Sequence, residues 1–340
     1  MMELELPNEG GCTAKLPARE LERLLAGMGW GSDPRVLVGL ETGDDAGVYL
    51  LSEELGLVLT TDFFPPFCRD PFLYGEVAAV NALSDVYAMG GTPLAALNIT
   101  MYPSGGDIAP LRTILEGGLA AARRAGIPII GGHTIANDTP VYGMAVLGRV
   151  DPGRMCTNAG LRPGMSLVLT KPIGTGVAMA AERLGLCPPE TYRVAVESMR
   201  QLNRAAATVA GELGAAACTD ITGFSLLGHA HRMAAASRAG IHLRVADVPF
   251  IPGAADLARM GCVPGATFRN AEYLQGQWEA GAGLAVHLRH LLLDPQTSGG
   301  LLFAVEPEKA TLAVARLRAE GYAFAGIVGH TVERQGLRVE

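Results

Sequence analysis

The residues whose type and position best suit them to chemistry are four aspartates that follow predicted strands or stand beside glycine. They are Asp45 in ETGDDAGV, Asp62 in LTTDFF, Asp85 in NALSDVYAMGG and Asp220 in CTDITGF. A single aspartate in such a place usually caps a helix or a turn. Four in similar contexts favour a shared cation site, because Mg²⁺ binds carboxylate oxygens together with substrate phosphates and water. Capping and metal-assisted binding of ATP stay open as alternatives.

One of these aspartates shares a predicted helix with an asparagine. Asn81 and Asp85 are four residues apart in the helix expected over residues 74–89, so their side chains project from one face. That face also carries Val77 and Ala78, so we expect it to point inward. Buried polar groups need hydrogen-bond partners. The pair is either a structural hydrogen-bonding pair or a face for metal and phosphate.

A cysteine and a lysine stand close together near the N-terminus, in GGCTAKL (residues 10–16). We expect Cys12, set among glycine and polar residues, to be accessible. A nearby ammonium group such as that of Lys15 favours the thiolate and raises its reactivity. Only three of the 27 basic residues are lysines, which favours a specific role for Lys15. The alternative is a mobile N-terminal tail with an incidental cysteine.

Three glycine-containing turns are less specific. GGHTIAND (residues 131–138) follows a predicted strand, and its glycines permit close approach of backbone to a phosphate; His133 is a polar contact or a core histidine. KPIGTG (171–176) has two interpretations: an anion-binding helix start, or a strand–turn–helix corner without a ligand. DPQTSGG (294–300) reads as a turn with no chemistry of its own. No Walker A loop or GxGxxG fingerprint is present.

Composition limits the class of protein. With 49% hydrophobic and 18% charged residues, the chain is not intrinsically disordered. Its formal charge of −7 makes it a poor non-specific binder of nucleic acid. We find no apolar stretch long enough for a membrane span and no signal peptide, so we expect a cytoplasmic protein. Six scattered cysteines without a CxxC pair are expected to be reduced thiols.

The elements that must position these residues alternate between strand and helix, which predicts an α/β or α+β protein. In the first half, strands are expected over 46–51, 57–61, 93–102, 127–130 and 141–150, and helices over 74–89 and 107–125. The second half opens with a strand over 166–170. It continues with helices around 175–185, 190–213, 223–236, 253–260 and 308–320, strands over 241–245 and 301–305, and closing strands. A Pro/Gly-rich loop places the boundary near 152–165.

Taken together and in order, the motifs resemble those of the selenophosphate synthetase (selenide, water dikinase) family. They are GGCTAK, GDDAGV, TTDFFPP, NALSDVYAMGGTP, GGHT, LTKPIGTG, TDITGFSLLGH, PGATFRN and DPQTSGGLL. The resemblance runs from about residue 10 to the C-terminus. GDDAGV and the helix with Asn81 and Asp85 are shared with the wider superfamily of aminoimidazole ribonucleotide synthetase and thiamine-monophosphate kinase. The N-terminal Cys and Lys, TTDFF, TDITGFSLLGH and DPQTSGG are more specific.

The resemblance implies an enzyme that converts selenide, ATP and water to selenophosphate, AMP and phosphate, and a homodimer whose N-terminal domains pack sheet on sheet. It implies an aminoimidazole ribonucleotide synthetase-like fold of two domains, each a mixed sheet with helices on one side. The division is residues 1–34 as a flexible segment with the catalytic Cys and Lys, 35–155 as the domain for ATP, metal and dimerisation, and 156–340 as the C-terminal domain.

The resemblance also assigns site residues. Cys12 and Lys15 match the catalytic residues. Magnesium ligands are implied at Asp45, Asp85 and Asp220. Contacts to ATP are implied at Lys15, Thr42, Gly43, Asp44, Asp62, Asn81, Asp85, Gly132, His133 and Thr134.

One departure from the family pattern matters. Many relatives carry a second cysteine two residues after the first, where this chain has Ala14, so a cysteine-pair mechanism is excluded. The alternatives to this activity are another kinase or ligase of the superfamily and a non-catalytic ATP-binding relative. Retention of both Cys12 and Lys15 counts against each of them.

Overall fold

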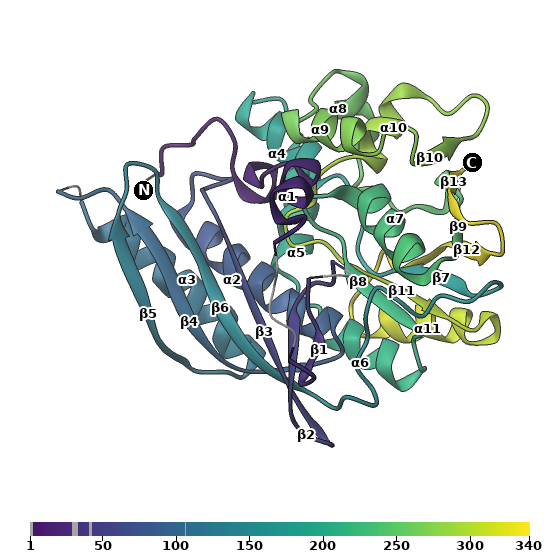
Figure 1. The fold of residues 1–340 in the computed structure, drawn as a ribbon. Coiled ribbons are helices and arrows are strands. Elements are labelled where there is room, and N and C mark those ends of the chain that lie inside the picture. The colour runs from purple at the N-terminus through teal and green to yellow at the C-terminus, as the bar shows by residue number, and fades with distance from the viewer. Residues whose placement is uncertain (1–2, 29–32, 41–42, 106) are drawn as a thin grey trace.

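The computed structural model of the protein describes residues 3–28, 33–40, 43–105 and 107–340. Two sheets lie side by side, each in its own α/β domain, and the N-terminal segment runs between them (Figure 1). No described helix is both long and apolar enough to cross a bilayer. The predicted division into 1–34, 35–155 and 156–340 remains our proposal. Between β6 and β7, residues 151–165 hold no helix or strand.

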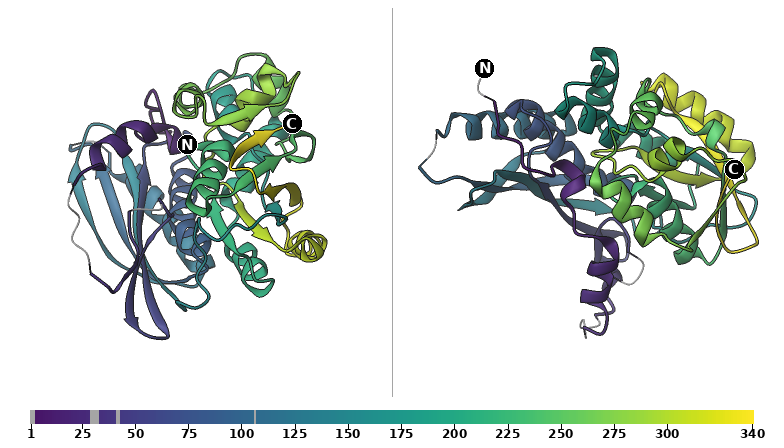
Figure 2. Two further views of the ribbon diagram at one scale, coloured as in Figure 1. Left: turned by 45° about the vertical axis from the view of Figure 1, so that its right-hand side comes forward. Right: turned by 90° about the horizontal axis from the view of Figure 1, so that it is seen from above.

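The first domain is built on a six-stranded sheet with the order β1-β2-β3-β6-β4-β5. All neighbours are antiparallel except β4 and β5. The strands are β1 (Val36–Val38), β2 (Gly47–Ser52), β3 (Leu55–Phe64), β4 (Thr92–Tyr102), β5 (Ile129–Ala136) and β6 (Val141–Val150). Helices α2 (Pro71–Ala88) and α3 (Ala109–Ala125) cover one face of this sheet (Figure 2).

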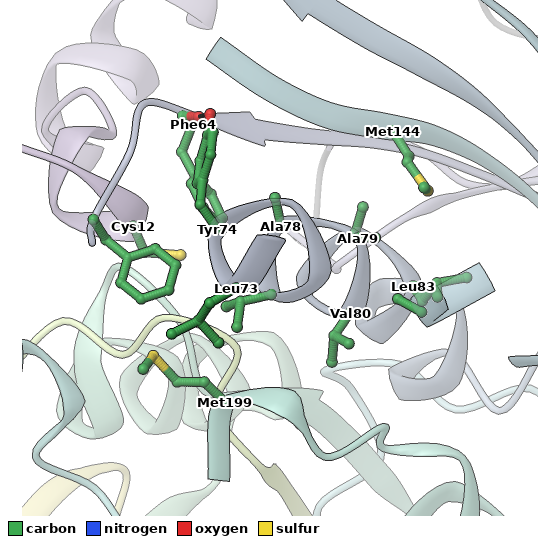
Figure 3. Packing of buried hydrophobic residues seen from close by; sticks show 14 of the residues in the cluster. Cys12, Phe64, Leu73, Tyr74, Ala78, Ala79, Val80, Leu83, Met144 and Met199 are labelled. Atoms are coloured by element: carbon green, nitrogen blue, oxygen red, sulfur yellow. Dashed lines mark hydrogen bonds between the residues drawn. The ribbon is translucent and has the colours of Figure 1, made fainter. Parts of the chain in front are cut away.

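Helix α2 is the central element of the molecule, since all its residues but Phe72 are buried. Most of its residues are apolar, as expected for a helix with no solvent face, and its few polar residues are buried as well. Asp70 caps it by accepting hydrogen bonds from the backbone N–H groups of Phe72 and Leu73 at 2.9 and 3.1 Å. Met144 of the sheet lies on one side of α2 and Met199 of the second domain on the other (Figure 3). The helix therefore carries Asn81 and Asp85 into the junction between the domains.

The second domain contains a seven-stranded sheet with the order β10-β13-β9-β12-β7-β11-β8. The strands are β7 (Ser166–Leu169), β8 (Ala217–Asp220), β9 (Gly240–Leu243), β10 (Trp278–Ala280), β11 (Leu301–Val305), β12 (Gly326–Val332) and β13 (Gly336–Val339). The helices are α4 (Thr175–Arg183), α5 (Pro189–Arg200), α6 (Arg204–Glu212), α7 (Ser225–Ser237), α8 (Ala254–Arg259), α9 (Gly265–Tyr273), α10 (Val286–Leu292) and α11 (Pro307–Ala319). Residues 11–14 and 245–247 form 3₁₀ turns, and α1 (Ala18–Leu25) follows the first of them.

Helices cover both faces of the second sheet. Alternate residues of a strand face opposite sides; Leu167 and Leu169 pack with α7, whereas Val168 packs with α6 and α11. The expected mixed sheets with helices are confirmed, but the one-sided arrangement holds only in the first domain. Strong apolarity on both sides of β11, which is fully buried, is the physical reason.

Two of the differences between the observed elements and the sequence prediction affect the site. The single helix expected over 190–213 is two helices, α5 and α6, because the Asn203 amide between them donates to Ser84 Oγ at 2.8 Å and to the Gly299 carbonyl at 2.9 Å. Strand β5 also runs on to Ala136, so Gly131–Thr134 lies in a strand and not in a turn. Backbone pairing with β4 extends it, and a Cβ at Gly132 would lie 2.3 Å from the Asn98 carbonyl.

Candidate active site

The N-terminal segment places Cys12 in the interior, between the two domains. The Gly11 N–H donates to the Pro65 carbonyl at 2.9 Å, and the Cys12 N–H donates to Thr297 Oγ1 at 3.1 Å. Gly10 permits this approach, since a Cβ there would lie 1.9 Å from the Pro66 carbonyl oxygen. Cys12 is 1% exposed. The prediction of an accessible cysteine was therefore wrong: neighbouring glycines allow the chain to pack closely.

The Cys12 side chain is a thiol in this environment. Its Sγ donates to Asn81 Oδ1 at 3.5 Å. Burial raises the pKa of Cys12 to about 12, while the positive charge of Lys15 acts in the opposite direction. Lys15 thus favours the thiolate, as predicted, but desolvation outweighs it. The negative charges of Asp62 and Asp220 raise the pKa further.

Lys15 joins the same hydrogen-bonded chain through Asp62. Lys15 Nζ lies 2.9 Å from Asp62 Oδ2, to which Asn81 Nδ2 also donates at 2.6 Å. The Lys15 side chain is 30% exposed and that of Asp62 10%. Burial lowers the pKa of Lys15, but the negative charges of Asp62 and Asp85 outweigh it and hold the pKa above its usual range. The structure thus brings Cys12, Asn81, Asp62 and Lys15 together, and Lys15 is an ammonium ion.

Three further aspartates lie beside this chain. Thr60 Oγ1 donates to Asp85 at 2.5 Å, and Thr219 Oγ1 donates to Asp45 Oδ1 at 3.0 Å. Burial raises the pKa of Asp45 and of Asp85, and in each case the charge of Asp220 raises it further. Burial raises the pKa of Asp220 to about 6, although the Ser84 hydroxyl and Lys15 oppose the shift.

The chemistry of these carboxylates fits a divalent cation. Oδ2 of Asp45 and Oδ2 of Asp220 are buried without a hydrogen-bond partner, which is costly for a carboxylate. A cation would satisfy both oxygens and relieve the repulsion between the charges. Among the described residues, no three His, Cys, Asp or Glu side chains form a ready cage for a metal ion. Mg²⁺ is commonly held by one or two carboxylates, with substrate phosphates and water as its other ligands.

The residues next to Asp45 are fixed against the second domain. The Asn158 N–H donates to Asp44 Oδ1 at 2.5 Å, and Asn158 Nδ2 donates to the Gly43 carbonyl at 2.9 Å. Asn158 lies between the two sheets in sequence. Gly43 and Asp44 therefore lie at the domain junction, beside the aspartates. Thr42, the third residue predicted here, lies outside the described residues.

Gly132, His133 and Thr134 do not join the cluster within one chain. They belong to the edge strand β5, which β6 and β4 separate from Asp62 on β3. Three steps between neighbouring strands amount to about 14 Å. His133 is exposed, so the alternative of a core histidine was wrong.

The segment DPQTSGG is part of the site, although its sequence indicated only a turn. Thr297 accepts from the Cys12 N–H, and the Ser298 N–H donates to Asn81 Oδ1 at 2.9 Å. Gln296 Oε1 accepts from the backbone N–H groups of Gly174 and Thr175 at 2.9 and 3.1 Å, which links the segment to the start of α4.

Lys171 anchors the same segment, donating to the carbonyl of Ser298 at 3.1 Å and to that of Gln201 at 2.6 Å. It is fully buried, and desolvation lowers its pKa to about 7. The signal for this role was present in the sequence as one of only three lysines, in LTKPIGTG. KPIGTG is therefore bound to protein groups at its lysine and at its helix start.

Comparison with known proteins identifies the family. The chain matches the AIR synthase related protein, N-terminal domain, over residues 43–150 and the corresponding C-terminal domain over residues 162–340. It is 48% identical over 328 residues to a selenide, water dikinase of Porphyromonas gingivalis, covering 96% of this chain and 94% of that one. It is 46% identical over 324 residues to the one of Pelobacter propionicus, covering 95% and 93%.

Among solved structures, AaThiL complexed with AMPPCP and TMP superposes with a TM-score of 0.66 at 18% identity. The superposition covers 94% of this chain and 91% of that one. This likeness shows the aminoimidazole ribonucleotide synthetase-like fold, as predicted. Two matched domains and near-full-length identity of almost one half show that the chain belongs to the selenide, water dikinase family.

Proposed function

We propose that this member of the family makes selenophosphate from selenide, ATP and water at the junction between its domains, with Cys12 and Lys15 as catalytic residues. The observation that carries the assignment is the hydrogen-bonded chain from Cys12 through Asn81 and Asp62 to Lys15. In the reaction the γ-phosphoryl group of ATP passes to selenide, and water cleaves the resulting ADP to AMP and phosphate. Phosphoryl transfer depends mainly on positioning and charge neutralisation, which this arrangement suits.

The aspartates hold the metal in this proposal. Asp45, Asp85 and Asp220 would bind Mg²⁺. This assignment is supported by the buried oxygens of Asp45 and Asp220 that have no hydrogen-bond partner. When bound, Mg²⁺ neutralises phosphate charge and orients the triphosphate. A net negative protein needs such a cation to accept a nucleotide.

Lys15 and Cys12 have distinct roles. Lys15 is a partly exposed ammonium ion, so it can turn from Asp62 to the phosphates as they arrive. Cys12 would receive or hold selenide; Asn81 Oδ1 accepts a hydrogen bond from its S–H. The closed N-terminal segment excludes water from the reacting atoms, which protects phosphorylated intermediates from wasteful hydrolysis.

The remaining predicted ATP contacts fall into two groups. Gly43, Asp44, Asp62 and Asn81 surround the site within one chain. Gly132, His133 and Thr134 lie about three strands away, so we assign their contact with ATP to the site of a partner subunit. This requires the homodimer that the resemblance implies.

An apolar sheet face supports the homodimer. Leu59, Phe63 and Leu97 are 51%, 43% and 43% exposed on the face opposite α2 and α3. Monomers rarely expose such a contiguous apolar surface. Sheet-on-sheet packing of two copies would cover it. We keep the cytoplasm as the proposed location; the free thiols of all six cysteines fit a reducing compartment.

The test is the formation of selenophosphate from ATP and selenide, followed by ³¹P NMR. Wild-type protein should give selenophosphate, AMP and orthophosphate in equal amounts. Lys15→Ala should lose most of its turnover while binding Mg²⁺-ATP with nearly unchanged affinity. Lys309→Ala removes a lysine that donates a hydrogen bond to the carbonyl of Leu213, which is not a residue of the proposed site, and it should behave as wild type. Equal activity of Lys15→Ala and wild type would remove Lys15 from the mechanism.

A further inference from the structure

Helix α9 of the second domain binds the segment that carries Cys12 and Lys15 through one arginine. Arg269 Nη1 and Nη2 donate to the two carboxylate oxygens of Glu9 at 2.6 and 2.9 Å, and Nη2 also donates to the Thr13 carbonyl at 2.6 Å. Glu9 precedes Cys12 by three residues and Thr13 follows it directly. One guanidinium therefore holds the chain on both sides of the cysteine.

The geometry suits a strong, directional contact. Parallel hydrogen bonds from a guanidinium to a carboxylate fix both the distance and the orientation of the two groups. The side chains are 31% and 38% exposed, so neither is a core residue and the contact can open without unfolding the domain. Gly265, at the start of α9, brings its backbone close to Glu9: a Cβ there would lie 3.2 Å from Glu9 Oε1.

The next residue of α9, Asn270, binds the loop on which the segment packs. Asn270 Nδ2 donates to the Gly223 carbonyl and to the Leu293 carbonyl, both at 3.0 Å. The segment rests on Gly223, where a Cβ would lie 2.9 Å from the Cys12 carbonyl oxygen and 3.1 Å from Lys15 Cδ. Asn270 thus supports the surface, and Arg269 holds the segment against it.

We propose that Arg269 is a positioning residue, which latches the Cys12–Lys15 segment closed over the aspartates through Glu9 and the Thr13 carbonyl. The inference rests on the proposed function for its consequence in catalysis, because Cys12 and Lys15 are the groups that the latch positions. The proposed latch also gives the motif PGATFRN a role: it ends on the two residues that hold the segment and its supporting loop.

The latch is tested by the rate at which iodoacetamide labels Cys12, measured by mass spectrometry of the Cys12 peptide without nucleotide or selenide. Cys12 is buried, so labelling reports opening of the segment. Cys187 is partly exposed and serves as the internal reference. In Arg269→Ala, labelling of Cys12 should rise about tenfold or more, because a hydrogen bond to a charged group typically contributes a factor of about ten. Cys187 labelling should not change.

Charge exchange separates a latch from a general structural role. Glu9→Arg and Arg269→Glu should each speed Cys12 labelling, and the double variant should slow it again. Arg259→Ala is the matched control, since it removes a helix arginine whose carboxylate partner, Asp256, lies on the same exposed turn; it should label as wild type. If iodoacetamide also labels the buried Cys218 in Arg269→Ala, that variant has lost its fold. Glu9→Gln then replaces Arg269→Ala in the test.

Turnover gives the second readout. The kcat of Arg269→Ala should fall about tenfold with KM for ATP nearly constant, since positioning acts on the reacting complex more than on ATP binding. Unchanged Cys12 labelling in Arg269→Ala and Glu9→Gln would overturn the latch, whatever the turnover. The labelling pattern needs no selenide, so a wild-type protein that labels as expected but makes no selenophosphate would refute the proposed function and leave the latch standing.

Discussion

Replacing Asp220 by asparagine should stabilise the nucleotide-free protein and abolish its stabilisation by Mg²⁺-ATP. Asp220 is 1% exposed, and its Oδ2 has no partner. Burial raises its pKa from the usual 3.8 to about 6. A shift of this size corresponds to about 3 kcal/mol at roughly 1.4 kcal/mol per pKa unit. Above pH 6 the carboxylate therefore opposes folding, and Asp220→Asn removes that cost.

The sign of the pH dependence follows from the raised pKa. The folded protein binds this proton more tightly than the unfolded chain, so the destabilising contribution of Asp220 decreases as the pH falls from 7 towards 4. Asp220→Asn should lack this contribution. The gain of about 3 kcal/mol is thus expected in full at pH 8 and should shrink towards zero near pH 4.

Thermal unfolding of wild type and variant at pH 8 and pH 5, with and without Mg²⁺-ATP, measures both effects. Without nucleotide, the variant should unfold at a higher temperature than wild type at pH 8. Excess Mg²⁺-ATP should raise the wild-type midpoint by mass action and leave the variant unchanged. Asp256→Asn, at an exposed helix position, should respond to nucleotide as wild type. A variant less stable at pH 8, or one still stabilised by Mg²⁺-ATP, would refute the reasoning.

Two further substitutions test other parts of the site. Asp294 is fully buried, and burial raises its pKa to about 7; its contribution to stability should fall as the pH rises from 4 to 7, and thermal unfolding of Asp294→Asn should lack that pH dependence. Gly223→Ala should displace the Cys12 carbonyl, which lies 2.9 Å from the new Cβ, and so speed Cys12 alkylation and lower turnover. Gly211→Ala, whose Cβ meets nothing within 4 Å, should change neither; equal alkylation in the two alanine variants would contradict the close packing.

Much of the fold could be predicted because local signals and tertiary packing agree. Strand β6 occupies the predicted residues 141–150, and α2 begins three residues before its prediction, at a Pro that suits the first turn of a helix. The second domain was predicted less completely. Helices α9 and α10 and strand β10 were missed, because they are short and their apolar residues show little periodicity.

The site was predicted in its residue types but not in its connections. The pairing of Asn81 with Asp62 joins residues 19 apart on different elements. The spacing on α2 alone indicated only that Asn81 and Asp85 share a face. The burial of Cys12 depends on contacts with Pro65 and Thr297, which no local pattern encodes.

The local sequence of DPQTSGG predicted its turn but not its burial. Its Gly and Pro predicted a turn, yet every residue of the segment is buried and most of its polar groups bind other elements. A turn that water could reach and a turn packed between two domains have the same local sequence. Only the second arrangement uses Thr297 and Ser298 to hold Cys12 and Asn81.

The most direct test of the account compares products formed from ATP by wild type and by Cys12→Ser, with and without selenide. Wild type should form AMP, orthophosphate and selenophosphate only when selenide is present. Cys12→Ser should form none of them while its thermal midpoint still rises with Mg²⁺-ATP, since serine keeps the backbone contact to Thr297. Full selenide-dependent activity in Cys12→Ser, or ADP as the final product of the wild type, would contradict the account.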